Sequence, residues 1–116
     1  MLEKAVFIQG LFPYVGSGLE NPVPFSTPLT YIVPQDKRAQ TVYFRAGNPS
    51  PELIYLVLTR RGTPMRYFPV GAKDGIHVPL SVLEDIAPGS IVELLIAAPR
   101  GIESTVLIDV GLMEIA

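Results

Sequence analysis

The sequence has no cysteine, no tryptophan and a single histidine, His77, among its 116 residues. Without cysteine there is no disulfide, thiolate metal site or cysteine nucleophile, and one histidine does not make a multi-histidine metal centre. The acidic residues Glu84, Asp85 and Glu93 also lack the spacing of a calcium loop. We therefore expect no metal ion and no cofactor.

The motifs of common catalytic sites are absent as well. The sequence contains no Gly-x-Ser-x-Gly elbow, no His-Glu-x-x-His pair and no Gly-x-x-x-x-Gly-Lys phosphate loop. His77 stands alone, which is more typical of a packed or surface histidine than of a general base. Because catalysis requires a positioned nucleophile, base or metal, we predict no catalytic residue and no enzyme activity.

Charge is scarce and nearly balanced. Nine Lys and Arg against eleven Asp and Glu give a net charge of −2, so no basic surface for nucleic acid is expected. The apolar stretch 105–115 is interrupted by Asp109, Gly111 and Glu114 and falls short of the roughly 20 residues that span a membrane. The run Ala5 to Ile8 is too short for a signal-peptide core, so we expect a cytoplasmic protein with no membrane partner.

Apolar residues are abundant, at 48% of the chain. A chain of this length forms one domain, because two cores would each be too small to be stable. A small soluble domain with so little charge has more apolar surface than its own core can hide. The composition therefore favours a homo-oligomer.

Twelve prolines and ten glycines separate short segments rich in Val, Ile, Tyr and Phe, which is typical of strands joined by tight turns. Turn signals that recur this often predict an all-β fold, an antiparallel β-sandwich. The predicted strands are 4–9, 29–33, 41–46, 53–60, 65–70, 76–79, 90–98 and 105–115.

Two segments depart from this rhythm. Residues 10–28 hold too much proline and glycine for a strand and too many large apolar residues for a solvated linker. They are predicted to form a packed loop or arm, which either closes one end of the sandwich or crosses to a neighbouring subunit. Residues 80–86 follow Pro79 and precede Pro88-Gly89, and could form one helical turn.

Alternation along the strands separates core positions from outward positions, because successive side chains point to opposite faces. The predicted core residues of two central strands are the larger apolar sets Val42, Phe44 and Ala46, and Ile54, Leu56 and Leu58.

If strands 41–46, 53–60 and 65–70 are neighbours in one sheet, their tyrosines share an outward face. This face would hold Tyr43, Arg45, Asn48, Tyr55 and Tyr67. Tyrosine and arginine are enriched in protein interfaces, and a tyrosine ring can also cover the apolar side of a sugar. The pattern leaves open a subunit interface and a carbohydrate-binding platform.

Two smaller groups of polar residues remain. Arg60, Arg61 and Arg66 flank a hairpin turn and could bind a carboxylate or phosphate, although solvated turn charges that protect strand edges are the stronger explanation. Asp109 lies within an apolar strand and is interpreted as an outward or ion-paired residue.

From Thr41 onward the chain resembles carbohydrate-binding modules with a galactose-binding-like jelly roll. The matching segments are Tyr43-Phe44-Arg45-Ala46-Gly47-Asn48, Leu53 to Leu58 before Gly62, His77-Val78-Pro79-Leu80, Pro88-Gly89, Val92 to Ile96 and Val106 to Ile115. Tyr31-Ile-Val-Pro followed by Arg38 to Asn48 is also similar to β-sandwich proteins of phage particles and other self-assembling modules. The resemblance implies a jelly roll that acts as an assembly module or, as the alternative, binds carbohydrate or another small ligand.

Overall fold

The computed structural model describes residues 3–80 and 85–116, and in these ranges all regular secondary structure is β-strand. The strands cover the centres of all eight predicted segments and add one short strand, β7. No helix in the described ranges is long and apolar enough to cross a membrane. The strands are β1 (Glu3–Val15), β2 (Val23–Ile32), β3 (Arg38–Asn48), β4 (Ile54–Arg60), β5 (Thr63–Val70), β6 (Asp74–Pro79), β7 (Asp85–Ile86), β8 (Ile91–Ala97) and β9 (Glu103–Ile115).

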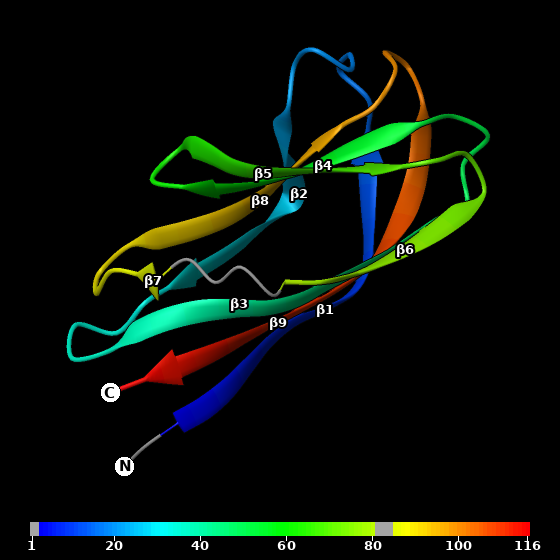
Figure 1. Ribbon diagram of the computed structural model, residues 1–116. Helices are drawn as coiled ribbons and strands as arrows, with labels where there is room; N and C mark the ends of the chain where they lie inside the picture. The colour runs from blue at the N-terminus through cyan, green and yellow to red at the C-terminus, as the bar shows by residue number, and fades with distance from the viewer. Residues whose placement is uncertain (1–2, 81–84) are drawn as a thin grey trace.

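The strands form two antiparallel sheets that pack as a sandwich (Figure 1). The five-stranded sheet has the order β1-β9-β3-β6, with β7 paired to β3, and the four-stranded sheet has the order β2-β8-β4-β5. Successive strands alternate between the sheets except at the β4–β5 hairpin and at β7. This double Greek-key order is that of a jelly roll, so the predicted fold class is confirmed.

The core lies between the two sheets and is built by the inward side chains of both. Phe44 of β3 stacks on Phe68 of β5, with ring centroids 3.8 Å apart and planes 2° from parallel. The predicted inward residues of β4, Ile54, Leu56 and Leu58, are all buried. The alternation in β4 therefore identified core positions correctly.

One polar bridge crosses the core between the sheets. The hydroxyl of Tyr31 on β2 donates a hydrogen bond to the carboxylate of Glu114 on β9, which is itself buried. Burial and this hydrogen bond raise the pKa of the Tyr31 hydroxyl well above its ordinary value of 10.0. The pair satisfies a carboxylate that would otherwise be costly to bury.

The predicted arm at 10–28 is wrong over most of its length, because residues 10–15 belong to β1 and residues 23–28 to β2. Both strands lie at sheet edges, where a proline costs little, since its missing N–H can face solvent rather than a neighbouring strand. Only residues 16–22 form a loop. Gly16 and Gly18 donate backbone hydrogen bonds of 2.7 and 2.8 Å to Ile102 and Ala98 of the same chain, which closes one end of the sandwich.

The predicted core position Val42 is also wrong, because its side chain is 43% exposed. The register of β3 against β9 shifts between Thr41 and Tyr43, so Val42 is the extra residue of a β-bulge. The bulge restarts the alternation, leaving Thr41 buried while Phe44 and Ala46 point into the core as predicted.

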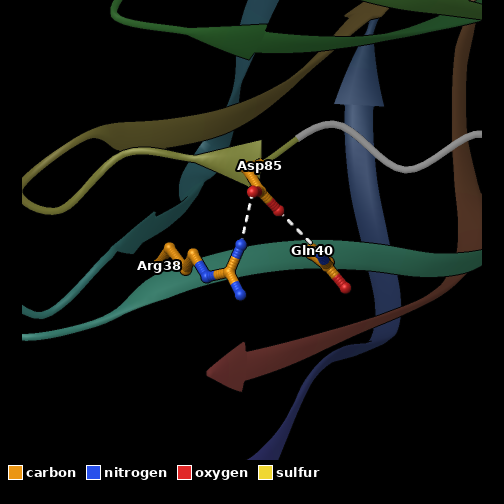
Figure 2. Close-up of polar contacts among 3 residues, drawn as sticks. All are labelled: Arg38, Gln40 and Asp85. Carbon is orange, nitrogen blue, oxygen red and sulfur yellow. Dashed lines mark hydrogen bonds and ion pairs between the residues drawn. The ribbon is translucent and has the colours of Figure 1, made fainter. Parts of the chain in front are cut away.

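The predicted helical turn at 80–86 lies mostly outside the described residues, and its last two residues form β7 rather than helix. Asp85 anchors this strand to β3. Its carboxylate accepts hydrogen bonds from Arg38 at 2.5 Å and from Gln40 at 2.6 Å (Figure 2). These two hydrogen bonds, from Gln40 and Arg38, lower the pKa of Asp85.

Candidate interaction surface

The structure does not bring the five predicted site residues to one face. Tyr43 and Arg45 lie on the outer face of the five-stranded sheet, whereas Tyr55 and Tyr67 lie on β4 and β5 in the four-stranded sheet. The single tyrosine platform is therefore wrong. The short connection from β3 to β4 crosses between sheets instead of forming a hairpin within one.

Asn48, the fifth of these residues, has a structural role. Its side chain is buried, and its amide donates to the carbonyl oxygens of Glu52 at 2.8 Å, Gly71 at 3.1 Å and Val70 at 3.2 Å. These hydrogen bonds tie the end of β3 to two neighbouring segments. The side-chain amide of Asn48 therefore stabilises the ends of these segments.

The three arginines predicted to form an anion cluster lie on and around the β4–β5 hairpin. Arg60 and Arg61 line a shallow depression at the β4–β5 turn, and Arg61 donates a 3.4 Å hydrogen bond to the carbonyl oxygen of Gly89. Arg66 lies further along β5, opposite Leu58, and does not line this depression. Two of the three predicted arginines therefore line this depression.

Polar residues instead form a row across the outer face of the five-stranded sheet. The register aligns Gln9 of β1 with Asp109 of β9, Asp109 with Arg45 of β3, and Arg45 with His77 of β6. We call these four residues the polar row. Since adjacent side chains in a row of paired strands are close neighbours, four segments distant in sequence contribute to one surface.

Asp109 is the centre of the polar row. Its Oδ1 accepts hydrogen bonds from the Tyr43 hydroxyl at 2.7 Å and from the Gln9 amide at 3.0 Å, and its Oδ2 lies 3.5 Å from Arg45 Nη1. These contacts confirm the interpretation of Asp109 as an ion-paired strand residue. The Tyr43 hydrogen bond, followed by that of Gln9, lowers the pKa of the Asp109 carboxyl, and the same Tyr43–Asp109 bond raises the pKa of Tyr43.

The Tyr43 ring reaches Asp109 by lying across a glycine. A Cβ on Gly111 would be 2.2 Å from Tyr43 Cε2, so the ring occupies the space that any side chain at Gly111 would need. The ring of His77 meets Tyr43 edge-on, at 6.2 Å between centroids and 88° between planes. Gly111 and His77 thus fix the tyrosine that orients Asp109.

Replacing Asp109 with asparagine is expected to lower the free energy of unfolding by about 1 kcal/mol at pH 7, because it removes charge-assisted hydrogen bonds. The pKa of Asp109 is lowered in the folded state, so its stabilisation is present above the ordinary carboxyl pKa of about 4 and is lost as pH falls through the lower folded value. Thermal unfolding of both proteins between neutral and acid pH measures this. If the difference in stability between the two proteins stays constant down to the most acid pH, a lowered pKa of Asp109 is contradicted.

Large apolar side chains lie beside the polar row. Phe7, Leu11 and Val15 project from the outer face of β1 and are 54%, 69% and 56% exposed, and Leu107, opposite Leu11 on β9, is 46% exposed. We call these four residues the apolar edge surface. Large exposed apolar side chains grouped along one edge of a sheet are typical of a contact surface.

A shallow hollow lies next to Leu107, on the side of β3 and β6. Gly47 and Gly75 are paired on β3 and β6 and have no side chains to fill the surface between Arg45, His77 and Leu107. It lies close to the depression formed by Leu11, Pro49, Lys73 and Asp74, which also includes Gly47 and Leu107. The face thus combines an apolar patch, a polar row and a hollow.

Sequence reasoning missed Gln9, Gly111 and the apolar edge surface. The alternating signal was present, since Phe7, Leu11, Pro13 and Val15 occupy outward positions of β1. It was hidden because residues 10–28 were interpreted as a loop, so no alternation was expected in the second half of β1. In the described parts of the chain, no group of three or more histidine or acidic side chains is placed to hold a metal.

Comparison with a solved viral structure, at a TM-score of 0.50, supports the fold. A chain in the structure of infectious bursal disease virus, Gx strain, superposes with a TM-score of 0.50 and 13% identity, over 98% of this chain and 33% of that chain. The exo-β-1,3-galactanase from Phanerochaete chrysosporium, solved with galactose, superposes with a TM-score of 0.44 and 12% identity, over 99% of this chain and 30% of that chain. This chain therefore spans about a third of the length of each. No family model and no curated protein matches the sequence.

Proposed function

We propose that this chain is a non-catalytic assembly module that binds further copies of itself through the apolar edge surface on β1 and β9. The observation that carries this proposal is the apolar edge surface, in which three side chains of one strand are each more than half exposed. Burying such side chains between two molecules removes them from water, at roughly 25 cal/mol per Å² of apolar area. The polar row crosses this surface at Gln9 and supplies the polar contacts that such surfaces commonly include.

The chemistry of the same face supports a non-catalytic role. Asp109 already accepts hydrogen bonds from Tyr43 and Gln9 and lies beside Arg45, and these contacts lower its pKa. A carboxylate held in this way is a weak proton acceptor, whereas a general base works best with a pKa near the operating pH. Turnover of a small molecule by the purified protein would contradict this part of the proposal.

Replacing Leu11 with aspartate is expected to dissociate the oligomer, raising Kd at least about tenfold, because it places a charge in the centre of the apolar contact. Light scattering over a wide concentration range measures the molar mass. Replacing Ile32 with aspartate is the matched control, since Ile32 is 61% exposed on edge strand β2 of the opposite sheet. That variant should retain the native mass. A native protein that is monomeric at every concentration refutes the proposal.

The hollow over Gly47 and Gly75 favours a second candidate function, the binding of a sugar or another small polar ligand. Arg45 and His77 could bind ligand hydroxyl or carboxylate oxygens there, and Leu107 could cover an apolar side of the ligand. A glycan array probes this function. Binding that is lost on replacing Arg45 with alanine would support it, and an array with no signal above background would contradict it.

A further inference from the structure

Four edge strands of the sandwich, β1, β2, β5 and β6, differ in how they are protected from pairing with another strand. Exposed edges are templates for association, and natural proteins usually interrupt them with prolines, bulges, charges or short length. β2 has Pro24 and Pro28 and a register shift between Pro24 and Leu29, and β5 has Pro64 and Pro69 and a shift opposite Leu58 and Thr59. β6 has only six residues, including Asp74 and His77.

β1 is the edge that lacks most of these devices. It has 13 residues and pairs with β9 from Glu3 to Val15 without a register shift. From Ala5 to Val15 it contains no charged residue, and Pro13 is its one proline. A long, regular and uncharged edge is suited to accept another strand.

Pro13 shows which backbone groups of β1 are free to pair. Proline has no backbone N–H. An uninterrupted ladder therefore accommodates proline only at a position where the N–H of another residue would point away from the neighbouring strand. The odd-numbered residues therefore direct their backbone N–H and C=O groups away from β9. Ala5, Phe7, Gln9 and Leu11 thus present a continuous series of donors and acceptors at the edge.

We infer that β1 pairs antiparallel with β1 of a second copy around a two-fold axis at Gln9, which joins two five-stranded sheets edge to edge. This inference rests on the proposed self-association and specifies its geometry. A two-fold interface must be complementary to itself. Around Gln9, Phe7 of one copy lies opposite Leu11 of the other, the two Gln9 residues meet, and Pro13 is kept at the end of the pairing, opposite Ala5.

Neighbouring registers are less favourable. An axis at Gly10 would place the amide of Gln9 opposite Leu11, and an axis at Leu11 would place Pro13 opposite Gln9, near the centre of the ladder. Only the axis at Gln9 pairs Phe7 of one copy with Leu11 of the other and also leaves the inner part of the ladder free of proline. The apolar edge surfaces of the two copies then become continuous.

Disulfide trapping tests this geometry, because the chain has no cysteine of its own. In a hydrogen-bonded antiparallel pair the two Cα atoms are about 5.5 Å apart, within the range of a disulfide. Replacing Gln9 with cysteine should therefore give a covalent dimer under mild oxidation. The matched control replaces Arg45 with cysteine, two strands away from the edge on the same face, and should remain monomeric on a denaturing gel.

The outcomes separate this inference from the proposed function. If the native protein is oligomeric but Arg45→Cys cross-links and Gln9→Cys does not, the copies pack face to face, and edge pairing is refuted while self-association stands. If the native protein is monomeric, both fail. If Gln9→Cys alone cross-links, edge pairing is supported.

Backbone pairing is tested by a second variant. Gln9→Pro removes an N–H that points to the partner and should raise Kd about tenfold relative to Gln9→Ala, with thermal unfolding of the two variants similar. Equal Kd values for these two variants would overturn the inference, because both lack the amide side chain and differ in the backbone donor.

Discussion

Replacing Phe44 with alanine is expected to lower the free energy of unfolding by ~3–5 kcal/mol. The Phe44 ring is fully buried and stacks on Phe68 of the opposite sheet, so its removal opens a cavity at the contact that joins the two sheets. For a domain of this size the loss corresponds to a fall in Tm on the order of 12–20 °C. Chemical denaturation monitored by circular dichroism measures the loss.

Val42→Ala is the matched control for Phe44→Ala, since both residues lie on β3 and both were predicted to be core. Val42 is exposed at the bulge, so its truncation should change the free energy of unfolding by no more than about 0.5 kcal/mol. A loss at Val42 comparable to that at Phe44 would mean that β3 alternates without a bulge.

Replacing Gly111 with alanine is expected to lower the free energy of unfolding by about 3 kcal/mol. The new Cβ would lie 2.2 Å from the Tyr43 ring, so the ring would have to move away from Asp109. The hydrogen bond between Tyr43 and Asp109 would be lost with it. The pKa of Tyr43, raised in the native protein chiefly by that bond, should then fall toward its ordinary value of 10.0. Urea unfolding measures the first effect, and an ultraviolet pH titration of the tyrosines measures the second.

Gly47→Ala is the control for Gly111→Ala, because Gly47 lies on the same outer face. A Cβ there would meet Leu107 at 3.5 and 3.6 Å, which are ordinary contacts. Gly47→Ala should be neutral or stabilise the fold by a few tenths of a kcal/mol through a less flexible unfolded chain. If Gly111→Ala is equally harmless, the Tyr43 ring does not depend on the glycine.

Local pattern was sufficient to place the centres of eight strands, but not the full extent of β1 and β2 or the short strand β7. The Val-, Ile- and aromatic-rich segments between proline and glycine turns became strands because both signals act within a few residues of the chain. The inward positions of β4 were predicted for the same reason, since a regular strand alternates without reference to its neighbours. Asp109 was predicted to be an outward or ion-paired residue, and both descriptions apply, since it lies beside Arg45 on the outer face.

Edge position explains why β1 and β2 were cut short in the prediction. Pro13, Pro24 and Pro28 argue against a strand in the interior of a sheet and are tolerated at an edge. Whether a strand lies at an edge depends on the order of all strands in the sheet. The outward residues of β1 could therefore be recognised as a surface only once that order was known.

The sequence by itself determined the class of fold, the centres of eight strands and the scarcity of reactive groups, because these follow from composition and short-range pattern. Only the tertiary structure decided that Tyr43 and Tyr55 lie in different sheets, that Val42 is extruded by a bulge, and that Gln9, Asp109, Arg45 and His77 form one row. The physical reason is that strand pairing joins segments more than a hundred residues apart. Such partners are selected by the packing of the whole core, and no local signal specifies them.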